Sequence, residues 1–159
     1  MIHAYFAYGS NMNAARMRER GVAFTHAEGA VLAGHALAFD KRAGHRDDAG
    51  HANIHWRRDA NVHGVLYRLA APDEIARLDV FERTPVNYSR EVYLLQPAGG
   101  GDPVPAWVYV ANPAARRDGL RPEASYLAHL LAGAHLLPAD YAMALRAVRC
   151  LDADADPNA

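Results

Sequence analysis

The chain has 159 residues, of which 51% are hydrophobic and 22% are charged, and its formal net charge is −1. This length suits a single domain with a packed core, and the composition excludes a disordered chain. Basic residues are interspersed with acidic ones and form no basic stripe, so we expect no nucleic-acid partner.

The first half of the chain predicts several strands and one short helix. Loosely alternating aromatic residues indicate a strand over 2–8 that ends in a glycine turn. A helix is expected over 14–20, because Asn11 or Asn13 can cap it and Gly21 can stop it. Three further strands are expected, at 30–39, 52–56 and 62–69, with a polar loop at 43–51.

The second half begins with a helix over 72–82, since Pro72 suits a first helical turn. Two strands follow at 88–96 and 104–110, joined by a hairpin-like run, and then two helices at 122–134 and 138–148 that each start with proline. Strands outnumber helices without βαβ alternation, so the expected class is α+β. We expect one domain over 1–150 and a disordered acidic tail over 151–159.

The sequence favours a cytoplasmic protein. The longest apolar stretch falls short of the ~20 residues that a membrane span needs, and the first residues lack a basic signal-peptide region. The single cysteine, Cys150, cannot form an intrachain disulfide, which agrees with a reducing compartment. We therefore expect no membrane partner.

The turn Tyr8, Gly9, Ser10, Asn11, Met12 is the first candidate site. A strand that turns through glycine into a helix start directs backbone N–H groups at one spot, which can bind an oxyanion or a carboxylate. The alternative is an ordinary turn in which Asn11 is a helix cap. The motif is not GxSxG, so Ser10 is not expected to be a nucleophile.

Glu82 is the second candidate. In a helix over 72–82, Ile75, Leu78 and Glu82 share one face, which places the carboxylate on the apolar stripe. Burial there would raise its pKa towards the range useful for proton transfer. The alternative is a solvated helix-end glutamate paired with Arg83 or Arg58.

Metal and nucleotide sites have no support. His51 and His55 share a face but lack a third ligand in sequence, and there is no HExxH motif or Cys/His cluster at zinc spacing. Neither GxxxxGK[ST] nor GxGxxG occurs. We expect no metal and no cofactor.

Three segments together resemble the gamma-glutamylcyclotransferase (AIG2-like) family. They are AYFAYGSNM at the start, LDVFE followed by PVNYSREV, and PEASYLAHLLAGAHLLPADYAMAL, and they occur in the family's order. The resemblance implies a compact mixed β-barrel of about six strands with surrounding helices. It also implies that Tyr8, Gly9, Ser10, Asn11 and Met12 hold the gamma-glutamyl group, that Glu82 is catalytic, and that Tyr126 helps to close the pocket.

The implied reaction cyclises a gamma-glutamyl-amino acid to 5-oxoproline and releases the amine, with Glu82 as general acid and base. Two departures from the family are Met12, where leucine is common, and Arg83, where many members have glycine; the second leaves the leaving group open. A gamma-glutamyl-amine, a gamma-glutamylated secondary metabolite and a non-catalytic binding or regulatory module are the alternatives. A homodimer is possible, although the sequence indicates no interface.

Overall fold

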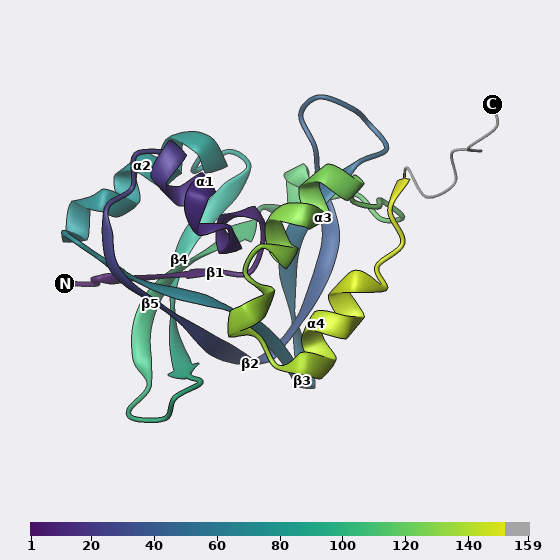
Figure 1. Cartoon of the computed structure of the whole chain (residues 1–159). Helices are drawn as coiled ribbons and strands as arrows, with labels where there is room; N and C mark the ends of the chain where they lie inside the picture. Colours follow the sequence, from purple (N-terminus) through teal and green to yellow (C-terminus); the bar gives the residue numbers. More distant parts are fainter. Residues whose placement is uncertain (152–159) are drawn as a thin grey trace.

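Five β-strands close into a barrel in the order β1-β3-β2-β4-β5 (Figure 1). All neighbours are antiparallel except β1 and β5, which are parallel at Tyr5 and Trp107. The computed structural model describes residues 1–151, and it confirms the predicted α+β class and mixed barrel. The strands are β1 (Ala4–Ala7), β2 (Phe24–Arg42), β3 (Gly50–Leu69), β4 (Tyr88–Pro97) and β5 (Val104–Ala111).

The barrel has five strands instead of about six because the two strands predicted at 52–56 and 62–69 are one. The intervening Arg57, Arg58 and Asp59 are exposed, and Asp59 has a left-handed φ of 63°. The β2 partner strand also shifts register between Ala33 and His35, opposite this stretch. These exposed charged residues interrupt the hydrophobic pattern, so the sequence predicted two strands where the structure has one continuous strand.

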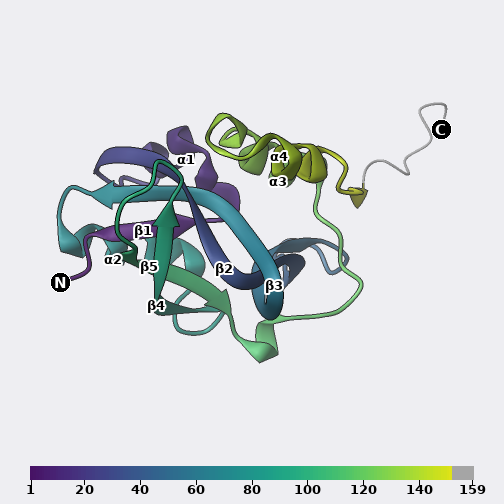
Figure 2. The same ribbon diagram turned by 90° about the horizontal axis from the view of Figure 1, so that it is seen from below.

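In the part of the chain that the structure describes, four α-helices and four 3₁₀ turns surround the barrel. Asn13 caps the first α-helix, since its Oδ1 accepts a hydrogen bond from the Ala15 N–H at 3.1 Å. The third and fourth helices lie side by side along one flank of the barrel (Figure 2). The helices are α1 (Ala14–Glu19), α2 (Ile75–Glu82), α3 (Ala124–Leu131) and α4 (Ala139–Arg146), and the turns are η1 (Ser10–Met12), η2 (Pro72–Glu74), η3 (Pro113–Ala115) and η4 (Ala134–Leu136).

The core consists of two clusters that share β1. Ala4 and Phe6 belong to a cluster supplied almost entirely by strands, which fills the barrel. Tyr5 and Ala7 belong to a second cluster that includes residues of α2, α3 and α4, such as Leu127. Because side chains alternate along a strand, the short β1 is buried on both faces and ends where the two clusters meet.

Two further expectations were a disordered acidic tail and the absence of a membrane partner. The acidic tail was placed at 151–159, and 152–159 lie outside the described residues. Among the residues that are described, no helix is both long and apolar enough to cross a membrane.

Candidate active site

α2 delivers Glu82 to the interior as its sequence pattern predicts. Ile75 and Leu78 are buried on the same face, and the Glu82 side chain is only 17% exposed. The helix ends immediately afterwards, because Arg83 adopts a left-handed conformation with φ 51°. The last residue of the helix therefore places a carboxylate in a partly open cavity.

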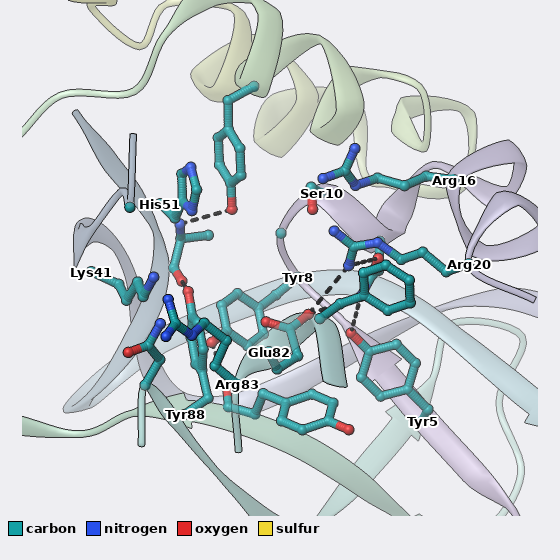
Figure 3. A pocket seen from close by; sticks show the side chains of 18 residues that line it. Tyr5, Tyr8, Ser10, Arg16, Arg20, Lys41, His51, Glu82, Arg83 and Tyr88 are labelled. Carbon is teal, nitrogen blue, oxygen red and sulfur yellow. Dashed lines mark hydrogen bonds and ion pairs between the residues drawn. The ribbon is translucent and has the colours of Figure 1, made fainter. Parts of the chain in front are cut away.

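This space is a cavity of about 210 Å³ between the end of β1 and the end of α2 (Figure 3). It brings together residues far apart in the sequence. Of the predicted site residues, the cavity is lined by Tyr8, Gly9, Ser10, Asn11, Glu82 and Tyr126. Met12 instead packs in the core with 2% exposure, and its N–H donates to the Gly9 carbonyl at 3.0 Å.

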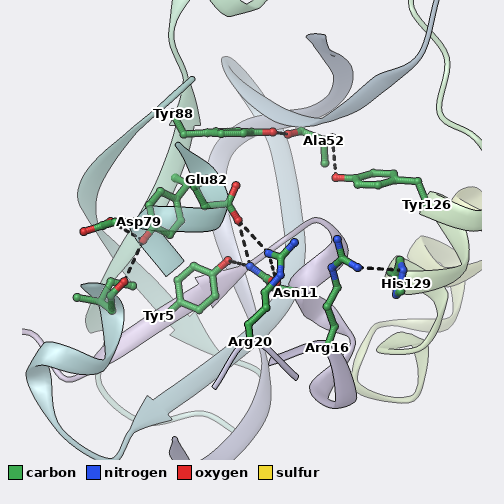
Figure 4. Close-up of polar contacts among 12 residues, drawn as sticks. Tyr5, Asn11, Arg16, Arg20, Ala52, Asp79, Glu82, Tyr88, Tyr126 and His129 are labelled. Carbon is green, nitrogen blue, oxygen red and sulfur yellow. Dashed lines mark hydrogen bonds and ion pairs between the residues drawn. The ribbon is translucent and has the colours of Figure 1, made fainter. Parts of the chain in front are cut away.

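Asn11 holds the Glu82 carboxylate in place (Figure 4). Its Nδ2 donates to Glu82 Oε1 at 3.2 Å and to the Tyr5 hydroxyl at 3.0 Å, while its Oδ1 accepts from Arg20 at 2.9 Å. Arg20 also lies 3.5 Å from Glu82 Oε1. These contacts reach Oε1, and none from a residue within 1–151 is seen at Oε2. One carboxylate oxygen is fixed and the other is available.

The pKa of Glu82 is raised above its ordinary value. Burial is the main cause, and it is opposed by the charges of Arg20 and Lys41 and by the Asn11 hydrogen bond. A carboxylate of this kind holds a proton more readily than a solvated one. It is therefore better suited than a solvated carboxylate to taking up and returning a proton.

Tyr126 and Tyr88 hold the backbone of Ala52 from two sides. The Ala52 N–H donates to the Tyr126 hydroxyl at 2.9 Å, and the Tyr88 hydroxyl donates to the Ala52 carbonyl at 2.8 Å. Burial raises the pKa of Tyr126, and hydrogen bonds from the N–H groups of Ala52 and Ser10 lower it. Because the Tyr126 oxygen accepts from the backbone, its own proton can be donated into the cavity.

Gly9 leaves room for this arrangement. A Cβ at this position would lie 3.1 Å from the Tyr126 hydroxyl and 3.1 Å from the Ala52 Cβ. Next to it, the Tyr8 hydroxyl donates to the Tyr109 carbonyl at 2.5 Å, which ties the end of β1 to β5. The glycine in the predicted turn therefore permits a close approach of three segments.

Most charged side chains that line the cavity are cationic. The sequence pattern did not single out most of them. Arg16, Arg20, Lys41 and Arg83 all line it, and Glu82 is the one carboxylate among the described lining residues. Arg16 and Arg20 are four residues apart around a helix, which is the one signal that could have predicted a shared face. Lys41 lies at the end of β2, just before the polar loop, and no sequence signal indicated that it would reach the cavity.

His51 adds an aromatic wall without adding charge. Its ring stacks on Tyr126 with 4.4 Å between centroids and 8° between planes. Burial, together with the charges of Lys41 and His45, lowers the pKa of His51 to about 4. It is therefore neutral near neutral pH. Within 1–151, no three His, Cys, Asp or Glu side chains gather as a metal site.

The sequence of residues 5–128 matches the family model described as "Gamma-glutamyl cyclotransferase, AIG2-like". No curated protein sequence matches the chain significantly. The match covers the turn after β1, Glu82 and Tyr126, so every segment that lines the cavity lies inside it.

Solved structures share the fold at low sequence identity. One named gamma-glutamyl cyclotransferase is 24% identical with a TM-score of 0.79, over 94% of this chain and 89% of its own. An uncharacterised Homo sapiens protein, loc79017, is 24% identical with a TM-score of 0.80 over the same shares. A yeast cyclotransferase described as specific to glutathione is 14% identical with a TM-score of 0.60, over 89% of this chain and 93% of its own.

Proposed function

The chain belongs to the AIG2-like gamma-glutamyl cyclotransferase family, and from this premise we propose that it cyclises a gamma-glutamyl-amino acid to 5-oxoproline and releases the amino acid. The observation that carries the proposal is Glu82, a largely buried carboxylate of raised pKa in a partly open cavity. Glu82 is the proposed general acid and base.

The gamma-glutamyl group is proposed to lie against the turn after β1. Ser10 and the Arg16 guanidinium border this side of the cavity, and Arg16 has its Nε buried without a partner among the described residues. An anionic alpha-carboxylate would satisfy such a cation. The substrate would then be bent so that its alpha-amine approaches its own gamma-carbonyl.

The reaction needs proton transfers through Glu82 and no external nucleophile. Glu82 takes a proton from the alpha-ammonium, and the freed amine attacks the gamma-carbonyl carbon to form the lactam C–N bond. As the tetrahedral intermediate collapses, the C–N bond to the leaving amine breaks and Glu82 returns its proton to that nitrogen. The ring nitrogen loses its remaining extra proton to water, which leaves the lactam N–H. The Tyr126 hydroxyl is the proposed hydrogen-bond donor to the oxygen that becomes negative.

The test is 5-oxoproline formation by the purified protein, read by chromatography, from gamma-glutamyl-amino acids, gamma-glutamyl-amines and glutathione. Glu82→Gln preserves the shape of the side chain but cannot exchange the proton, so kcat should fall roughly 10²- to 10⁴-fold. Glu19→Gln is the matched control, because Glu19 is exposed on α1 and does not line the cavity.

Near-normal turnover by Glu82→Gln would remove Glu82 from the mechanism. No product from any substrate, with the protein folded by circular dichroism, would favour a non-catalytic binding module on the same fold.

A further inference from the structure

The cavity has two cationic sides separated by Glu82. Ser10, Arg16 and Arg20 lie on one side of the carboxylate, while Lys41 and Arg83 lie on the other (Figure 3). The first side is the one proposed for the gamma-glutamyl group. A substrate whose gamma-carbonyl is at Glu82 must therefore extend its leaving group towards Lys41 and Arg83.

Lys41 is a buried lysine that forms no ion pair with a described carboxylate. The residue is 6% exposed, and its Nζ lies 5.6 Å from the centre of the Tyr88 ring. No carboxylate of residues 1–151 forms an ion pair with it. Lysine is rarely buried unless it is paired, since removing an ammonium from water is costly. The charge of Glu82 raises the Lys41 pKa, but the ion pair of Glu82 is with Arg20, so an anion beside Lys41 would supply the missing partner.

Arg83 is a second cation on the Lys41 side of the cavity, and its backbone is in a strained conformation. Its φ of 51° lies in the left-handed region that glycine occupies without strain, yet the residue is arginine and its side chain lines the cavity. Burial lowers the pKa of Lys41, the charge of Glu82 opposes this shift, and the charge of Arg83 adds to it, so Arg83 lies near Lys41. Two like charges held together are stabilised by an anion bound between them.

We infer that Lys41 and Arg83 form a binding site for a carboxylate on the leaving group, and that this pair selects gamma-glutamyl-amino acids over gamma-glutamyl-amines. This inference rests on the proposed cyclotransferase function. Lys41 and Arg83 are specificity-determining residues: they contact the departing amino acid and take no part in proton transfer.

The test compares two substrates that differ only in this carboxylate, gamma-glutamyl-alanine and gamma-glutamyl-ethylamide. Wild-type kcat/KM should favour gamma-glutamyl-alanine by roughly 10- to 100-fold, the worth of a hydrogen bond to a charged group. The ratio should fall towards one in Lys41→Met, which keeps the stem against Tyr88, and in Arg83→Gly. Arg42→Gln is the control, because Arg42 is exposed and donates to the Ala114 carbonyl.

Arg83→Gly also separates binding from folding. Glycine relieves the left-handed strain, so its melting temperature should be equal to or higher than that of the wild type while its substrate preference is lost.

The other outcomes are distinct. A wild-type ratio near one, or a ratio that survives both substitutions, overturns the leaving-group site and leaves the cyclotransferase function standing. Equal losses on both substrates would show that the two cations bind the glutamyl half, which also overturns the inference. Absence of 5-oxoproline from both substrates would overturn the proposed function and this inference with it.

Discussion

Replacing Tyr126 by phenylalanine should damage both stability and catalysis. The Tyr126 hydroxyl accepts the Ala52 N–H at 2.9 Å, and Ala52 is buried while Tyr126 is partly buried. Removing it leaves a buried N–H without an acceptor, which costs about 1–3 kcal/mol of unfolding free energy. If the same hydroxyl donates to the reacting oxygen, kcat should also fall about 10²- to 10³-fold, as for loss of one oxyanion donor.

Tyr88→Phe is the matched comparison, because it also removes one hydroxyl from the Ala52 peptide. There the Tyr88 proton is already donated to the Ala52 carbonyl at 2.8 Å, so the hydroxyl has no proton to offer a substrate. Urea unfolding should show comparable destabilisation in the two variants, whereas steady-state kinetics should show a much larger loss for Tyr126→Phe. Equal kinetic losses would refute a direct role of the Tyr126 hydroxyl in the reaction.

Three other substitutions test Glu82, its partner Arg20 and the packing of Met12 in the turn after β1. Arg20→Met removes a charge that lowers the Glu82 pKa, so the acid limb of a kcat/KM–pH profile should move to higher pH. Glu82→Gln should gain stability relative to wild type in urea unfolding as the pH rises above the pKa of an unfolded glutamate, because burial raises the Glu82 pKa in the folded state. The wild type has its full stability below the unfolded pKa and loses stability as the pH rises through the folded one. Gly133→Ala would place a Cβ 2.9 Å from the Met12 carbonyl oxygen, so thermal melting should show about 1–3 kcal/mol of destabilisation and kinetics a higher KM.

Local patterns in the sequence predicted the elements that present the site. The spacing of Ile75, Leu78 and Glu82 placed the carboxylate on a buried face, and the structure agrees. The Gly9 turn and the Asn13 cap follow from short-range backbone chemistry in the same way. Such features depend on neighbours within about one helical turn, and one sequence is enough to see them.

Local sequence patterns could not identify the cation that forms an ion pair with Glu82. Spacing suggested Arg83 or Arg58, but the cation that contacts it is Arg20, which lies 62 residues away in the sequence. Lys41 reaches the cavity because the β2 ladder and its register irregularity between Ala38 and Lys41 bring it there. Contacts that depend on barrel closure and register leave no periodic signal in the chain.

The closure of the barrel by β1 and β5 also determines when during folding the cavity can exist. The hydrogen bonds that shape it join residues 71 apart (Asn11 to Glu82), 74 apart (Ala52 to Tyr126) and 101 apart (Tyr8 to Tyr109). Non-local contacts of this kind form slowly, because the entropy of closing long loops opposes them. A nascent chain still lacking Tyr126 has no complete cavity, so ligand binding can begin only after nearly the whole domain has left the ribosome.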